Sequence, residues 1–155
     1  MSRTLSLLII IFFTTVACTN SEDNVVAFSD RPSDREFDSG EFLEYRVPST
    51  DSSCFYDIDV YARIHHSSKA DKIPLIIRII SPAGKIYADT LRLNANNNSA
   101  YPSYARSGVW RDYKWSYRNR VTLPENGTWY FRIDLIEGSN PVSGLTELGF
   151  IFSKR

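Results

Sequence analysis

The 155-residue chain has little cysteine, with Cys18 and Cys54 as its two thiols. Two thiols allow at most one intramolecular disulfide, and even this is lost if either cysteine has another role. A disulfide-dense scaffold is therefore excluded, and the fold must depend on a hydrophobic core. We interpret Cys54 as a small buried hydrophobic residue, because nothing in the sequence specifies the basic, partly exposed surroundings of a reactive thiol.

The chain also lacks a net charge, with 18 basic and 18 acidic residues. This balance gives no electrostatic argument for a nucleic-acid partner, and we expect none. Catalytic patterns are missing too, since there is no Ser-His-Asp order, glycine-rich phosphate loop or metal-ligand spacing. Adjacent His65 and His66 would point to opposite faces of an extended chain, which disfavours chelation of one metal ion. We expect no enzyme, no cofactor and no metal; the enzymatic alternative is the carboxylate pair Asp57 and Asp59 on one strand face.

No membrane-spanning run of roughly 20 apolar residues is found at the N-terminus. The short apolar run there, from Leu5 to Phe13, follows Arg3 and precedes Val16-Ala17-Cys18. A charged start, a short apolar segment and a small residue before the cut site are typical of a secretory signal peptide. The last three residues resemble the lipobox of bacterial lipoproteins, although Thr15 stands where leucine is usual. We therefore expect residues 1–17 to be a lipoprotein signal peptide; the alternative is an ordinary signal peptide with a chance cysteine.

Lipidation at Cys18 would anchor the mature chain to a lipid bilayer without a transmembrane helix. A diacylglycerol plus an amide-linked third chain exceeds the two signals that stable anchoring requires. Thr19 follows the cysteine, which resembles lipoproteins sent on to the outer membrane, so we expect an outer-membrane location in the cell envelope. Glu22-Asp23 is either a solvated part of the tether or a surface-export signal of Bacteroidota type, and the leaflet stays open.

The sequence after the predicted signal peptide indicates a single all-β domain. No segment shows a sustained helical period, and short alternating or apolar segments lie between turn signals, which is typical of an antiparallel β-sandwich of Ig-like or jelly-roll-like type. We assign residues 18–40 to a lipidated polar tether and residues 41–155 to the sandwich. Strands are expected at residues 25–28 (a short edge strand), 41–48, 54–64, 74–80, 85–93, 128–136 and 145–153. Period two places Ile58 and Val60 on the buried face, and the turn at residues 81–85 predicts a hairpin.

An aromatic stretch follows the long polar segment 94–108. Between Tyr101 and Tyr117 six aromatic residues alternate with basic ones, and if the chain is extended Val109, Arg111, Tyr113, Trp115 and Tyr117 share one face. Three roles stay open: packing onto the sandwich, a protein interface, or sugar stacking with Arg111 and Asp112 as hydrogen-bonding partners. We expect Trp115 and Tyr117 to pack and the polar-loop tyrosines to be exposed, so the candidate interface residues are Tyr101, Tyr104, Trp110 and Arg111.

The order of these features resembles the GldH family, the gliding-motility lipoproteins of Bacteroidota. The resemblance covers residues 40–154 and the lipobox cysteine, through the segments YDIDVYARI, SPAGKIYADTL, KWSYRNRVTLPENGTWYFRI and GLTELGFIFSK. It implies a non-catalytic envelope lipoprotein whose partners are other motility and type IX secretion proteins, with no cofactor. Only the lipidated Cys18 carries over as a functional residue. Asp89-Thr90-Leu91 also looks like the pattern on which Bacteroidota O-glycosylate exported proteins, with Thr90 as acceptor; the alternative is an ordinary strand residue.

Overall fold

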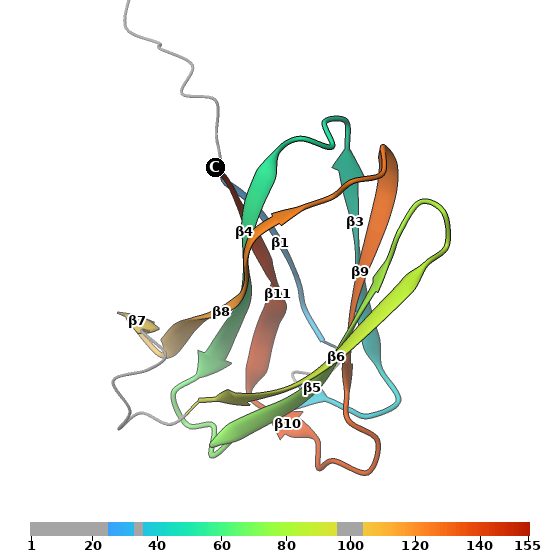
Figure 1. Cartoon of the computed structure of the whole chain (residues 1–155). Coiled ribbons are helices and arrows are strands. Elements are labelled where there is room, and N and C mark those ends of the chain that lie inside the picture. Colours follow the sequence, from blue (N-terminus) through green and yellow to red (C-terminus); the bar gives the residue numbers. More distant parts are fainter. Residues whose placement is uncertain (1–24, 33–35, 96–103) are drawn as a thin grey trace, which may run out of the picture.

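The computed structural model describes residues 25–32, 36–95 and 104–155, and every regular element within them is a β-strand (Figure 1). The strands are β1 (Val25–Asp30), β2 (Glu36–Phe37), β3 (Phe42–Ser49), β4 (Phe55–His65), β5 (Lys72–Ile80), β6 (Ile86–Asn94), β7 (Tyr104–Ser107), β8 (Trp110–Thr122), β9 (Gly127–Leu135), β10 (Val142–Ser143) and β11 (Leu145–Lys154). Among the described residues, no helix is long and apolar enough to cross a membrane.

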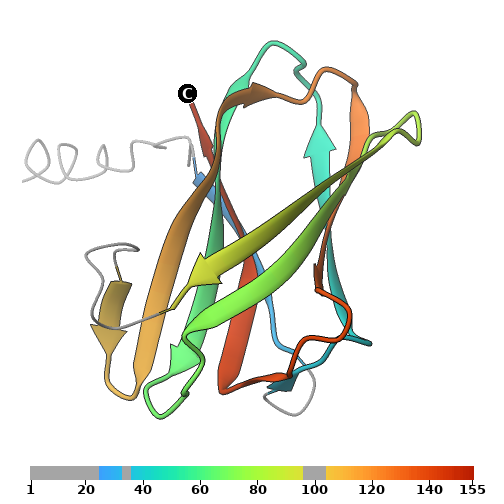
Figure 2. The ribbon, with the colours of Figure 1, turned by 60° about the horizontal axis from the view of Figure 1, so that its bottom comes forward.

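Two antiparallel sheets face each other across the core. One sheet has the strand order β1-β11-β4-β8-β7, the other has the order β3-β9-β5-β6, and β10 pairs with β2 in a small ribbon. The β5–β6 hairpin runs obliquely across one side of the sandwich (Figure 2). The predicted all-β antiparallel sandwich is thus confirmed, as is the hairpin, in which Leu75 pairs with Leu91.

The core forms from the inward face of each alternating strand. In β4, Ile58, Val60 and their alternating neighbours are buried as predicted, because side chains of a strand point alternately to its two faces. Aromatic rings then join the two sheets, since Phe131 of β9 meets the ring edges of Phe150 and Phe152 of β11 at centroid distances of 5.4 and 5.1 Å. Such edge contacts add about 0.5–1.5 kcal/mol each to the area that they bury.

Polar contacts close the sandwich along the side where β6 and β8 lie. Tyr117 of β8 donates from its hydroxyl to Asp89 of β6 at 2.5 Å, and Arg118 donates to the same carboxylate at 2.6 Å. The indole nitrogen of Trp115 donates to the carbonyl oxygen of Asn94 at 3.0 Å. These contacts join β6, an edge strand of one sheet, to β8, which lies next to the edge of the other sheet, where no backbone ladder connects them.

The folded part begins earlier than we expected from the sequence. Strand β1 pairs with β11 from Val25 to Asp30, and β2 pairs with β10, although both lie in the range 18–40 assigned to the tether. The predicted edge strand at residues 25–28 is therefore present and two residues longer. Its close approach to β11 requires glycine, because a Cβ at Gly149 would overlap the carbonyl oxygen of Phe28.

Candidate functional site

Three aromatic side chains of β8, those of Tyr113, Trp115 and Tyr117, point into the sandwich. Tyr113 is fully buried and stacks on Trp115 with ring centroids 5.3 Å apart, and its hydroxyl donates to the carbonyl oxygen of Ala95 at 3.0 Å. Trp115 and Tyr117 are partly buried and pack against the core, as predicted. Packing and hydrogen bonds within the sandwich therefore engage all three rings on this face of β8.

Arg111 corrects one of our interface assignments. Its side chain is 5% exposed, and one guanidinium nitrogen donates to the backbone carbonyls of His65, His66 and Ser68 at 3.4, 3.2 and 3.3 Å. The other terminal nitrogen donates to the Tyr113 hydroxyl at 3.1 Å. Arg111 thus fixes the turn after β4 from inside the fold and is not available on the surface. The alternation of β8 already placed it on the inward face, so the signal was present in the sequence.

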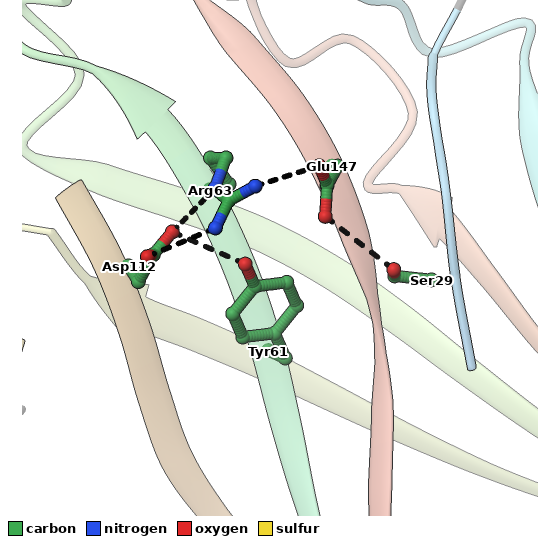
Figure 3. A network of polar contacts seen from close by, with 5 residues as sticks. All are labelled: Ser29, Tyr61, Arg63, Asp112 and Glu147. Carbon is green, nitrogen blue, oxygen red and sulfur yellow. Dashed lines mark hydrogen bonds and ion pairs between the residues drawn. The ribbon is translucent and has the colours of Figure 1, made fainter. Parts of the chain in front are cut away.

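Asp112 is committed to a polar network on the outer face of the larger sheet (Figure 3). It accepts from Arg63 at 2.6 and 3.1 Å and from the Tyr61 hydroxyl at 3.1 Å. Arg63 also donates to Glu147 at 3.1 Å, and the Ser29 hydroxyl lies 3.5 Å from the same carboxylate, so the network crosses four strands. The Arg63 guanidinium holds the pKa of Asp112 below its usual range, while burial raises the pKa of Tyr61 to about 12. Asp112 is therefore paired with Arg63 of the same molecule, which disfavours its predicted role as a hydrogen-bonding partner for a sugar.

Asp57 and Asp59, the carboxylate pair of the enzymatic alternative, also make contacts with other side chains and the backbone of the protein. Asp57 accepts from the backbone nitrogen of Arg120 at 2.9 Å and from Arg155 Nε at 2.6 Å, and both contacts lower its pKa. Asp59 is 9% exposed and lies 3.4 Å from Lys114 Nζ. A general acid of a glycoside hydrolase needs a raised pKa. The environment of Asp57 lowers its pKa instead, which disfavours that role.

Trp110 lies at the end of the sandwich where β4 ends and β8 begins. Its ring meets the edge of the His65 ring at a centroid distance of 5.1 Å, and both side chains line a cavity of about 580 Å³. The His65 and His66 rings lie only 4.5 Å apart, contrary to our expectation of opposite faces, because β4 ends at His65 and the chain turns. Among the described residues, no group of three or more potential metal ligands is found.

The remaining predicted site residues are placed as follows. Cys18 and Tyr101 lie outside the described residues, and Tyr104 opens β7 with a side chain that is not described. Thr90 is exposed on edge strand β6. Cys54 is half-buried rather than buried, because it sits in the turn before β4, where its thiol contacts Asp51 at 3.0 Å.

No family model matches the chain. The chain is similar to the gliding motility lipoprotein GldH homolog of Christiangramia forsetii, with 22% identity over 153 residues that cover 94% of each chain. The similarity therefore extends over nearly the whole length of both proteins. It confirms the resemblance to the GldH family that the motifs of this sequence indicated.

Proposed function

We propose that this protein is a non-catalytic lipoprotein of the cell envelope that supports gliding motility and type IX secretion through contacts with other envelope proteins. One observation carries the proposal, namely the near full-length similarity to a protein named as a gliding motility lipoprotein. The lipobox-like Val16-Ala17-Cys18 supports the anchor independently of that similarity. The contacts of Asp57 with Arg120 and Arg155, which lower its pKa, disfavour a catalytic role for this carboxylate.

The anchor is tested by replacing Cys18 with serine in the native host. A lipid-bearing Cys18 with Thr19 after it should place the wild-type protein in the outer-membrane fraction at mature size. The Cys18→Ser precursor should keep residues 1–17 and incorporate no radiolabelled palmitate. Cys54→Ser is the matched control, because a thiol in a turn of the folded domain should not affect processing. Mature-size Cys18→Ser protein in the outer membrane would contradict the anchor.

The role in motility and secretion is tested by deleting the gene and complementing the deletion. We expect loss of spreading on agar or loss of type IX cargo from the medium, with rescue by the wild-type chain. Cys18→Ser should fail to rescue, whereas Cys54→Ser should rescue fully. If the deletion changes neither spreading nor secretion, the proposed function is wrong, whatever the state of the anchor.

Thr90 is proposed as an O-glycosylation site of the exported protein. Its side chain is exposed on β6, an edge strand that pairs only with β5 among the described strands, so an enzyme can reach the hydroxyl. Asp89, however, accepts hydrogen bonds from Tyr117 and Arg118, which holds this carboxylate toward β8. Intact-mass measurement of wild type and Thr90→Ala decides the question; equal masses, apart from the substitution itself, would show that Thr90 is unmodified.

A further inference from the structure

The cavity beside Trp110 has the size of a small-molecule site. Its volume of about 580 Å³ lies within the roughly 300–1,000 Å³ that is usual for ligand pockets. Besides Trp110 and His65, its lining includes Glu36, Lys69, Thr146 and three serines. One indole ring and a set of mixed hydrogen-bonding groups thus converge from four separate segments of the chain.

The frame of this cavity is fixed before any ligand arrives. Arg111 ties down the turn after β4 through its three carbonyl contacts, and the His65 backbone nitrogen donates to the Gly144 carbonyl at 2.8 Å. The Ser68 hydroxyl donates to the Ser143 carbonyl at 2.7 Å. Gly144 has φ +77°, and a Cβ there would lie 3.1 Å from the Ser68 Cβ, so the two wall segments meet closely. A rigid wall reduces the ordering cost of binding.

Two lining groups differ in what they offer a ligand. His65 Nδ1 lies 2.6 Å from the Ser67 hydroxyl oxygen and 3.3 Å from the Ser67 backbone nitrogen, so Ser67 engages Nδ1 rather than Nε2. The Thr146 side chain is 7% exposed, and its Oγ1 has no hydrogen-bond partner within the described part of the chain. This oxygen has less than 1 Å² of accessible surface, so it is closed off from the cavity and contributes no contact to a ligand.

The charges and the ring define the ligand chemistry. The Glu36 carboxylate and the Lys69 ammonium cancel, so the lining favours neither an anion nor a cation. Carboxylate, imidazole N–H, ammonium and hydroxyl groups together suit a ligand whose hydroxyls both donate and accept. The indole face of Trp110 suits the C–H face of a sugar ring. We propose that this cavity binds a neutral saccharide, through residues other than the Arg111 and Asp112 that the sequence suggested. The proposal goes beyond the motility role and does not depend on it.

The test uses the full-length lipoprotein, purified in a detergent that has no sugar headgroup. Maltose, lactose and N,N′-diacetylchitobiose are titrated by isothermal calorimetry and by indole fluorescence. We expect saturable binding of at least one of them, and loss of that binding in Trp110→Ala. Glu36→Gln, at an exposed position, should weaken the affinity by about tenfold, the effect of one lost hydrogen bond to a ligand.

The control variant is Tyr87→Ala, an exposed aromatic on the β5–β6 hairpin outside the cavity lining, which should bind as the wild type does. The control ligands are the zwitterion alanyl-alanine and inorganic phosphate. If no saccharide binds, or if a control ligand binds instead with the same dependence on Trp110, the saccharide assignment is wrong. Binding that survives both Trp110→Ala and Glu36→Gln would also overturn it. Loss of motility in the gene deletion has no bearing on these outcomes, so the two proposals fail separately.

Discussion

Replacing Arg111 with alanine should destabilise the sandwich far more than removing an exposed arginine. The guanidinium donates to three backbone carbonyls and one hydroxyl while only 5% exposed. Hydrogen bonds to a charged group contribute about 1.5–3 kcal/mol each, but the freed carbonyls of the turn can partly rehydrate, so we expect a total of about 3 kcal/mol. For a domain of this size, that loss lowers the melting temperature by about 10 °C.

The matched control is Arg118→Ala. Arg118 also pairs with a carboxylate, Asp89 at 2.6 Å, but its side chain is 48% exposed, so its loss should cost under about 1 kcal/mol. Arg111→Lys keeps the charge but loses the planar fork of donors and should fall between the two. Thermal and urea unfolding of the three variants measures the differences. Equal shifts for Arg111→Ala and Arg118→Ala would refute the view that Arg111 fixes the turn from inside.

Three further predictions concern the edge strand, the outer-face network and the packed indole. Gly149→Ala should displace β1 from β11, cost about 1–3 kcal/mol, and speed amide hydrogen exchange at residues 25–30; unchanged exchange there would contradict the close approach. Because Arg63 lowers the folded-state pKa of Asp112, this carboxylate stabilises the fold fully above its unfolded pKa of about 3.9 and loses that effect as the pH falls through the lower folded value. The stability gap between wild type and Asp112→Asn in urea should therefore shrink from pH 6 to pH 2, and a constant gap would refute the linkage. Trp115→Ala should lower stability by about 3 kcal/mol in thermal unfolding yet keep partner binding per folded molecule; unchanged stability with lost binding would make Trp115 a contact residue.

The sandwich was accessible from the sequence because strands such as β3 and β4 alternate and turn signals separate the strands. In β4, Ile58 and Val60 could be assigned to the core from period two alone, since a half-buried strand must place its apolar side chains on one face. The same reasoning placed Trp115 and Tyr117 inward. The β5–β6 hairpin followed from a turn with Pro82 and Gly84 at positions that suit their backbone preferences.

What the sequence did not show depends on contacts between distant segments. Strand β1 stays in place because Gly149, near the other end of the chain, leaves room for the carbonyl of Phe28, and no local signal reports this. Arg111 was assigned to the candidate interface as a hydrogen-bonding partner for a sugar, although its alternation pointed inward. The cavity beside Trp110 combines segments that are separated widely in sequence, so neither spacing nor a motif could reveal it.

The position of β1 allows the length of the predicted tether to be compared with the length of the sandwich. Val25, where β1 begins, pairs with Ser153 at the end of the sandwich that also carries the C-terminus (Figure 1). The cavity is lined by His65, the last residue of β4, and so lies at the opposite end. If Cys18 holds the lipid, seven residue steps reach at most about 25 Å. The 11 residues of β4 span about 33 Å from one end of the sandwich to the other. A tether of that length would be shorter than the sandwich, so a domain anchored through Cys18 could tilt or lie flat, but its end with the cavity could not turn toward the bilayer that holds the lipid.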